Sequence, residues 1–305
     1  MKKTLLLGSF ALMGLMASAQ TSVSFATSEA LEALGLTTDA ADYPAGTLIA
    51  EGEAGTLELG AADQWKIFTP AGNYKNITVN GVEVTLSAGV TGSTNPSPNT
   101  LDGAPENGAF YVITPEADGW VTVFTKLNTN KQYVVFEGKT TPMSYTLGWT
   151  NGTEKIQYTL PADENYALDL NSPDIDKYVD VSTMKPYMPW QVAGYAEQQG
   201  ENTGFLTFNA MGGLTYYFAA YGSKAACGGF TLTEGDAEPV VVFKAVEGDN
   251  PLPEVVFGNA GGDSGVATVG ANVDKNAPIY NLMGQKVSAD AKGVLIQNGK
   301  KFIRK

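Results

Sequence analysis

The chain has 305 residues and a formal net charge of −13, with 19 basic and 32 acidic residues, one cysteine and no histidine. This composition excludes nucleophilic catalysis that depends on histidine, a histidine-ligated metal, an internal disulfide and a thiolate cluster. It also argues against a nucleic-acid partner, because phosphate contacts need clustered lysine and arginine and the only arginine is Arg304. The options that remain are binding and carboxylate chemistry.

The first 19 residues have the pattern of a secretory signal peptide. Lys2 and Lys3 give a positive start, residues 4–16 are uncharged and mostly apolar, and Ala17–Ala19 supplies a small-x-small cleavage site. The apolar run is short for a membrane span, which needs about 20 residues. We therefore predict a secreted or cell-surface protein whose mature chain begins at Gln20 and has no membrane span. A short membrane anchor is the alternative.

The rest of the chain up to residue 246 favours β-structure. Only Ser28–Leu34 has a helical pattern, and Trp65 and Trp120 lie inside apolar runs, so we expect both rings in the core. Segments rich in Val, Thr, Tyr and Phe, separated by Gly, Asn, Asp and Pro, are typical of strands. The predicted strands are Gly55–Leu59, Trp65–Thr69, Tyr74–Val79, Val82–Leu86, Ala109–Thr114, Gly119–Lys126, Gln132–Glu137, Ser144–Trp149, Lys155–Leu160, Gly204–Asn209, Leu214–Tyr221, Gly229–Thr233 and Val240–Val246. Without crossover helices for a parallel sheet, the sequence predicts an all-β sandwich over residues 20–246.

Two local patterns add detail to this body. Asn80 and Gly81 stand between two alternating runs, which predicts a two-residue hairpin turn. The stretch Asn171–Pro189 contains three prolines and is predicted to be a long irregular loop.

A weak internal echo relates two parts of the body. Gly119–Phe124 followed by Gln132–Phe136 resembles Gly204–Phe208 followed by Thr215–Phe218. Either the chain contains a duplication or it contains two hairpins of the kind common to β-sandwiches, and we favour the second interpretation.

Composition changes after Val246. Residues 247–276 are rich in glycine and small polar residues, which predicts a flexible linker. Residues 277–305 carry six basic residues and one acidic residue, Asp290, whereas the other 31 acidic residues precede them. This reversal of charge indicates an appended unit with a separate role. A hairpin that completes the main sandwich is the alternative.

The tail resembles a known export signal. Its matching residues are Tyr280, Leu282, Gly284, Val287, Lys292, Gly293, Gly299 and Lys300. The order of these residues resembles the pattern of the C-terminal sorting domain found in proteins exported by the Por-type (type IX) secretion system of Bacteroidetes. The resemblance implies a small β unit that contacts the secretion machinery.

The body resembles, more loosely, secreted β-sandwich proteins from the same bacteria. The residues concerned are Asp118–Val123, Tyr133–Val135, Tyr216–Lys224 and Gly229–Phe230. This resemblance implies a jelly-roll-like antiparallel sandwich, similar to a carbohydrate-binding module, and it transfers no binding residue.

Paired carboxylates are the one catalytic option. Glycoside hydrolysis needs two acids about 5 to 10 Å apart, and nothing in the sequence pairs Asp63, Glu83, Asp169 or Glu197. A solvated acidic surface explains these residues more simply, so we predict no catalytic residue and no enzyme. Cys227, between alanines and glycines, is predicted to be a small buried hydrophobe.

The densest acidic loop comprises Asp169, Asn171, Asp174 and Asp176. Ca²⁺ takes six to eight oxygen ligands, although this spacing lacks the glycine and distal glutamate of an EF-hand. Two interpretations stay open: a calcium or other cation site, and a polar loop whose side chains bond to their own backbone. No other cofactor is expected.

Aromatic residues in loops are the best ligand-binding candidates, because carbohydrate pockets combine apolar walls with a few polar groups. Trp149 stands at a hairpin mouth, and Tyr187, Trp190 and Tyr195 lie in or just after the proline-interrupted stretch. We predict a non-catalytic binding protein for a polysaccharide or surface glycan. The alternatives are a structural surface protein or adhesin that binds protein partners, and a small polysaccharide-degrading enzyme.

Overall fold

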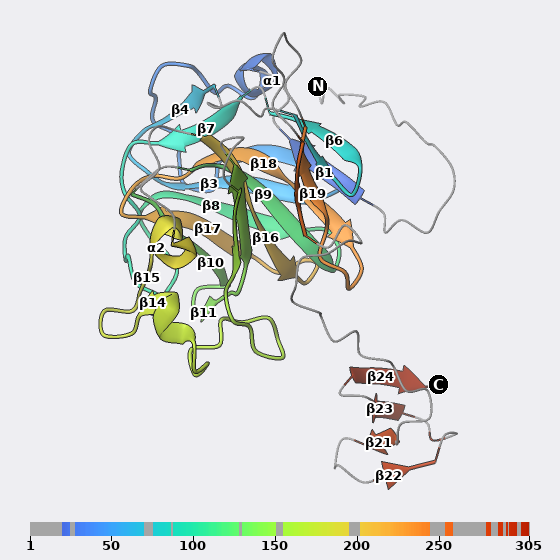
Figure 1. Cartoon of the computed structure of the whole chain (residues 1–305). Coiled ribbons are helices and arrows are strands. Elements are labelled where there is room, and N and C mark those ends of the chain that lie inside the picture. The colour runs from blue at the N-terminus through green and yellow to red at the C-terminus, as the bar shows by residue number, and fades with distance from the viewer. Residues whose placement is uncertain are drawn as a thin grey trace. The chain divides into compact units, whose positions relative to one another are not determined.

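The computed structural model describes residues 20–24, 28–69, 76–86, 88–127, 130–150, 155–194, 202–244, 254–258, 279–281, 286–288, 291, 293–297 and 300–304. The chain divides into two compact units, residues 1–260 and 261–305. Almost all regular structure is antiparallel β, as the sequence predicts (Figure 1). No helix in the described part of the chain is long and apolar enough to cross a membrane. The predicted signal peptide lies outside the described residues.

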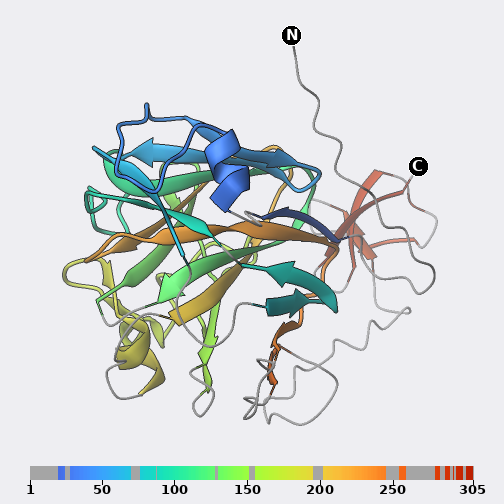
Figure 2. The same cartoon turned by 90° about the horizontal axis from the view of Figure 1, so that it is seen from above.

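Two large sheets form the body. Sheet A has the order β13 (Lys155–Thr159), β12 (Thr146–Thr150), β16 (Asn202–Ala210), β9 (Gly119–Leu127), β18 (Ala226–Glu234), β7 (Gly89–Gly92) and β4 (Trp65–Phe68), and β1 (Gln20–Ser24) also pairs with β18. Sheet B has the order β11 (Thr141–Pro142), β10 (Gln132–Glu137), β17 (Tyr216–Tyr221), β8 (Gly108–Pro115), β3 (Gly55–Ala61) and β2 (Leu48–Gly52). In Figure 2 the dark blue β1 lies along the orange β18. Apart from Tyr74–Val79, Val82–Leu86 and Val240–Val246, each strand predicted in the body has its counterpart in these two sheets.

In the two segments that echo each other, the chain crosses between the sheets and forms no local hairpin. Strands β9 and β10 are consecutive but lie in different sheets, and so do β16 and β17. Instead β9 pairs with β16, with Thr122 opposite Thr207, and β10 pairs with β17, with Val135 opposite Phe218. The two segments that echo each other in sequence are thus direct partners, so they are not two separate hairpins. The sandwich is established by these pairings, and the name jelly-roll stays a prediction.

One continuous core lies between sheets A and B. Alternate residues of β9, such as Val121 and Val123, point into it and are fully buried. Trp65 is also fully buried and contacts the Tyr111 ring edge-on, with ring centroids 5.5 Å apart. The expectation for Trp65 is confirmed, whereas Trp120 is only half-buried.

A third, smaller sheet lies against the outer face of sheet A. Sheet C has the order β20 (Val255–Phe257), β19 (Val241–Phe243), β5 (Asn76–Val79) and β6 (Val82–Thr85). Its Phe243 and Phe257 form a second hydrophobic cluster with Phe124 and Phe205 of sheet A. Strand β20 falls inside the predicted linker, so the linker boundary at residue 247 is wrong: the buried ring of Phe257 ties this segment to the body. The rest of the predicted linker, apart from residues 254–258, lies outside the described residues.

The predicted turn at Asn80 and Gly81 is confirmed. Both residues have positive φ, 48° and 81°, and they connect β5 to β6 with Val79 opposite Val82. The turn also fastens sheet C internally, because the Asn80 side-chain oxygen accepts a hydrogen bond from the Val240 backbone N–H at 2.9 Å.

The helices are short. Helix α1 (Ser28–Ala33) matches the predicted one. The stretch predicted to be irregular contains a 3₁₀ turn at Ile175–Lys177 and the strand pair β14 (Val179–Asp180) and β15 (Lys185–Pro186), and helix α2 (Pro189–Ala193) follows it. Proline begins α2 rather than breaking it, since the first helical position tolerates the missing N–H.

The second unit contains a sheet of its own. Its order is β22 (Lys286–Val287), β21 (Ile279–Asn281), β23 (Gly293–Gln297) and β24 (Lys300–Arg304). As far as the chain is described, these strands pair only with one another. The interpretation of the tail as an appended unit stays a prediction, and so does the alternative in which it completes the main sandwich.

Candidate functional site

Two of the predicted ligand-binding aromatics lie in the interior. Trp149 points inward from β12 and is 2% exposed, and Trp190 at the start of α2 is 4% exposed. Their rings pack edge to face, with centroids 5.4 Å apart. The two tryptophans therefore join α2 to the sandwich and offer no open ring face on which a sugar can stack.

The other two aromatic candidates differ. Tyr187 is half-buried, and its backbone N–H bonds to the Tyr178 carbonyl at 2.7 Å, which leaves its ring as a candidate. Tyr195 lies outside the described residues.

The acidic loop bonds largely to itself. The Asp169 carboxylate accepts a hydrogen bond from the Asn171 backbone N–H at 3.0 Å, and Asp174 pairs with Lys177 at 2.6 Å. Asn171, Asp174 and Asp176 are exposed. Among the described residues, no three His, Cys, Asp or Glu side chains gather in a way that could hold a metal. The contacts fit the interpretation of a polar loop, and they give calcium no observed cluster of ligands.

The remaining chemical candidates are dispersed or enclosed. Asp63 precedes β4, and Glu83 on β6 pairs with Lys244 at 3.2 Å, while Glu197 lies outside the described residues. Cys227 is fully buried, as predicted, and burial raises the pKa of its thiol to about 12. The thiol therefore stays protonated and unreactive at neutral pH.

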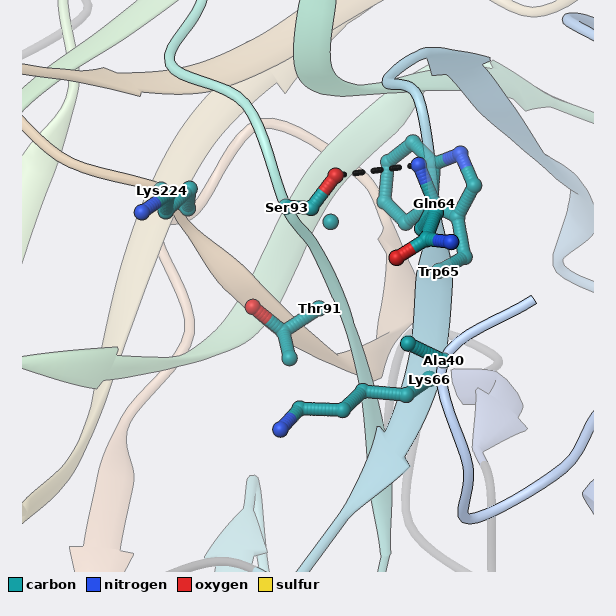
Figure 3. A pocket seen from close by; sticks show the side chains of 8 residues that line it. Ala40, Gln64, Trp65, Lys66, Thr91, Ser93 and Lys224 are labelled. Carbon is teal, nitrogen blue, oxygen red and sulfur yellow. Dashed lines mark hydrogen bonds between the residues drawn. The ribbon is translucent and has the colours of Figure 1, made fainter. Parts of the chain in front are cut away.

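A pocket that the sequence did not predict opens at the β4 edge of sheet A (Figure 3). Its volume is about 310 Å³, at the lower end of the range for small-molecule sites. Most of its exposed lining is apolar, and a few polar and charged side chains are set into it. The lining residues are Ala40, Gln64, Trp65, Lys66, Thr91, Gly92, Ser93 and Lys224.

We call this pocket the edge pocket. The ends of two strands hold its mouth in place. The Gln64 backbone N–H donates to Ser93 Oγ at 3.0 Å, and the Ser93 N–H donates to the Gln64 carbonyl at 2.8 Å. The Ser93 hydroxyl hydrogen and the Gln64 side-chain amide stay exposed at the rim. The edge pocket thus presents hydrogen-bonding groups on a backbone that is held in place.

Strand register sets the middle of the edge pocket. Lys66 lies opposite Thr91, and both point outward because their neighbours Trp65 and Gly92 face the core. Gly92 is required here, since a Cβ would come within 2.7 Å of the Ala109 Cβ. Figure 3 shows Lys66 and Lys224 on either side of Thr91.

Buried polar contacts hold together the strands that lie beneath the edge pocket. The Tyr111 hydroxyl bonds to the carbonyls of Val90, at 2.5 Å, and Ala225, at 3.2 Å, and so ties β7 to the start of β18. Burial holds the pKa of Tyr111 well above its usual range. Lys131, which is 3% exposed, donates to the Lys224 carbonyl at 2.6 Å and thereby holds the segment that carries Lys224.

A second polar feature crosses the outer face of sheet A. Five threonines lie in register on adjacent strands, and we call them the hydroxyl row: Thr159, Thr146, Thr207, Thr122 and Thr231. Two side-chain hydrogen bonds join members of the row, Thr146 to Thr159 at 2.7 Å and Thr122 to Thr207 at 2.9 Å.

Beyond the last of these bonds, three buried polar atoms are left without a partner among the described residues. They are Thr231 Oγ1, Thr233 Oγ1 and Trp120 Nε1. Thr233 and Trp120 are cross-strand neighbours, and Thr231 is two residues away on the same face.

No local sequence pattern signals the edge pocket, because its residues come from segments far apart in the chain. The alternation of Trp65, Lys66 and Ile67 predicts that Lys66 points outward, but only the folded sheet brings Lys224 to the same place. Comparison with family models, curated proteins and solved structures finds no match for this chain. The case for function therefore depends on the site itself.

Proposed function

We propose that this protein is a non-catalytic carbohydrate-binding protein that acts outside the cell or at its surface, with the edge pocket as its binding site. The observation that carries the proposal is the exposed set of hydrogen-bonding groups on paired strands: the Gln64 amide, the Ser93 hydroxyl and the Lys66 ammonium. Sugars present hydroxyls that donate and accept, and an amide beside a hydroxyl matches both roles. A pocket of about 310 Å³ suits one or two sugar rings better than a folded protein segment.

The rigidity of the site supports binding in preference to catalysis. The edge pocket lies on strands whose backbones are bonded to each other, so little ordering is needed when a ligand binds. Among the described residues, those that line it include no carboxylate, whereas glycoside hydrolysis needs two.

Affinity electrophoresis and a glycan array with the purified protein test the proposal. Gln64→Ala and Ser93→Ala should each weaken retention about threefold to tenfold, the effect of a lost neutral hydrogen bond. Gln157→Ala is the matched control, because Gln157 is an exposed glutamine on β13, the opposite edge strand of the same sheet. Absence of retention on every polysaccharide would exclude the proposal.

We also propose that the tail delivers the body to the cell surface. The tail has its own four-stranded sheet and a positive charge, and it resembles the sorting domain. Deleting residues 277–305 should leave the urea midpoint of the body unchanged and retain the protein inside the cell envelope. Fractionation of cells that express the two forms tests this, and normal surface display of the shortened chain would overturn it.

A further inference from the structure

We propose that the edge pocket selects an acidic carbohydrate, one that carries a carboxylate or a sulfate on the sugar. This inference rests on the proposed function and adds the class of ligand. It assigns the contacts with the anionic group to Lys66 and Lys224, and the contacts with sugar hydroxyls to Gln64 and Ser93.

The two lysines come from different parts of the fold. Lys66 is exposed in the middle of β4, and Lys224 is half-buried just before β18. Both line the edge pocket together with Thr91, which lies between them in the view of Figure 3. The Thr91 hydroxyl donates its hydrogen to the Ala225 carbonyl at 3.4 Å. An anionic group placed there therefore meets the two ammonium groups as donors, and hydrogen bonds from charged donors are stronger than neutral ones.

A third lysine extends the positive surface. Lys126 is on the same outer face of sheet A, and its ammonium lies 5.9 Å from the centre of the Phe68 ring. Phe68 is on β4 and is half-buried, two residues from Lys66. A chain of acidic sugars leaving the edge pocket along this face would pass a cation and a partly exposed ring.

The acidic character of the whole chain does not oppose this assignment. The chain has a net charge of −13, which repels an acidic polysaccharide at long range. Charges more than about 8 Å from the ligand are largely screened at physiological ionic strength, whereas two lysines in direct contact are not. Binding should therefore be slow to form and sensitive to salt, yet selective once the anionic group is seated.

Lys131 is a positioning residue for this site. It is almost fully buried and donates to the Lys224 carbonyl at 2.6 Å and to Ser223 Oγ at 3.4 Å. A buried ammonium bonded to the backbone of the loop keeps the Lys224 side chain at the pocket rather than free in solvent. Its effect on binding should therefore act through Lys224.

The test compares one sugar with and without its charge. Polygalacturonate and its fully methyl-esterified form share a backbone and differ in the carboxylate, and chondroitin sulfate and dextran sulfate add sulfated probes. We expect retention on at least one of the acidic probes and at least tenfold weaker retention on the neutral form and on plain dextran. Lys66→Gln and Lys224→Gln should each weaken the acidic interaction about tenfold, as expected for a bond from a charged donor. Lys139→Gln is the control, an exposed lysine outside the edge pocket that loses the same charge.

The possible results separate the two proposals. Retention on neutral polysaccharides alone, or acidic retention that Lys66→Gln and Lys224→Gln leave unchanged, overturns the selectivity and leaves carbohydrate binding standing. Retention on no polysaccharide overturns both. Lys131→Gln should weaken acidic binding in the natural sequence and add no further loss to Lys224→Gln, because the two act as one unit. Additive losses would refute the positioning role.

Discussion

The outer face of sheet A is organised differently over its central strands β9 and β16, which we call the covered end, and at its β4 edge, which we call the open end. At the covered end Phe124 and Phe205 point outward, and sheet C covers them. Phe243 and Phe257 of sheet C pack against these two rings and are themselves 0% exposed. At the other end the outward positions are held by Lys66 and Thr91, and the surface stays open as the edge pocket. The same sheet therefore has a third layer over one part and a solvated hollow over the other.

This difference shows how outward-facing residues decide what a sandwich can do. Burying a phenylalanine side chain stabilises the folded state by about 1.5–3 kcal/mol, so a third layer that covers two outward rings is favourable. A lysine ammonium resists burial without a partner, and it keeps the adjacent area free of such a layer. The covered end contributes stability, and the open end is free for binding.

The largest expected effect comes from removing the covered end. Phe257→Ala should lower the free energy of unfolding by about 3–5 kcal/mol, because the ring is fully buried between Phe205 and Phe243 at 5.2 and 5.1 Å. Val256→Ala is the control. Val256 is next to Phe257 in the chain and its side chain is 37% exposed, so this substitution should change the free energy of unfolding by less than about 0.5 kcal/mol. Urea unfolding measures both. Equal small effects would mean that sheet C is not a structural layer.

The hydroxyl row on the same face of sheet A gives a paired test of smaller size. Thr122→Val removes the bond at 2.9 Å and leaves the Thr207 hydroxyl unpaired, at a cost of about 1–3 kcal/mol. Thr231→Val removes a buried hydroxyl that has no partner among the described residues and should be neutral or stabilising. Denaturation of the two variants side by side measures the contrast. A loss of stability in Thr231→Val would show that this hydroxyl has a partner.

The buried thiol of Cys227 on β18 should make the protein less stable at alkaline pH. Burial raises the pKa of Cys227 to about 12, above the value of about 8.5 for a free thiol. The folded state therefore favours the protonated thiol, so the stabilisation is complete below pH 8.5 and declines as the pH rises toward 12. One pH unit into this window removes about 1.4 kcal/mol.

Unfolding curves from pH 8 to pH 10 measure this decline. Cys227→Ala should show a shallower loss across that range, although its stability at pH 7 is lower because a buried side chain is truncated. Identical slopes for both proteins would assign the alkaline sensitivity to the buried tyrosines, which titrate at higher pH.

Much of the fold follows from the sequence because alternation and turn residues act locally. The strands around Asn80 and Gly81 were predictable, since that turn requires positive φ whatever surrounds it. Strand β7 was missed because it begins and ends with glycine. A Cβ at Gly89 would lie 2.2 Å from the Phe68 ring, so packing selects a residue that disfavours strands.

The site was harder to predict, for a related reason. Aromatic residues in a loop suggested a binding surface at Trp149 and Trp190, but the loop folds back as α2 and the rings bury each other. The edge pocket depends on pairing between β4 and β7 and on the start of β18, contacts that no local pattern encodes. Strand periodicity predicts which way Lys66 points, and only tertiary structure gives its neighbours.

The smallest expected effect on stability belongs to the open end, and it completes the comparison. Lys66→Gln and Lys224→Gln should each change the free energy of unfolding by less than about 0.5 kcal/mol, because their side chains reach solvent and fill no part of the core. The same two variants are expected to lose about tenfold in binding to an acidic polysaccharide. Urea midpoints and affinity electrophoresis on the same protein samples measure both quantities. A loss of stability as large as that of Phe257→Ala would mean that these lysines serve the fold, and that the open end is a structural surface like the covered one.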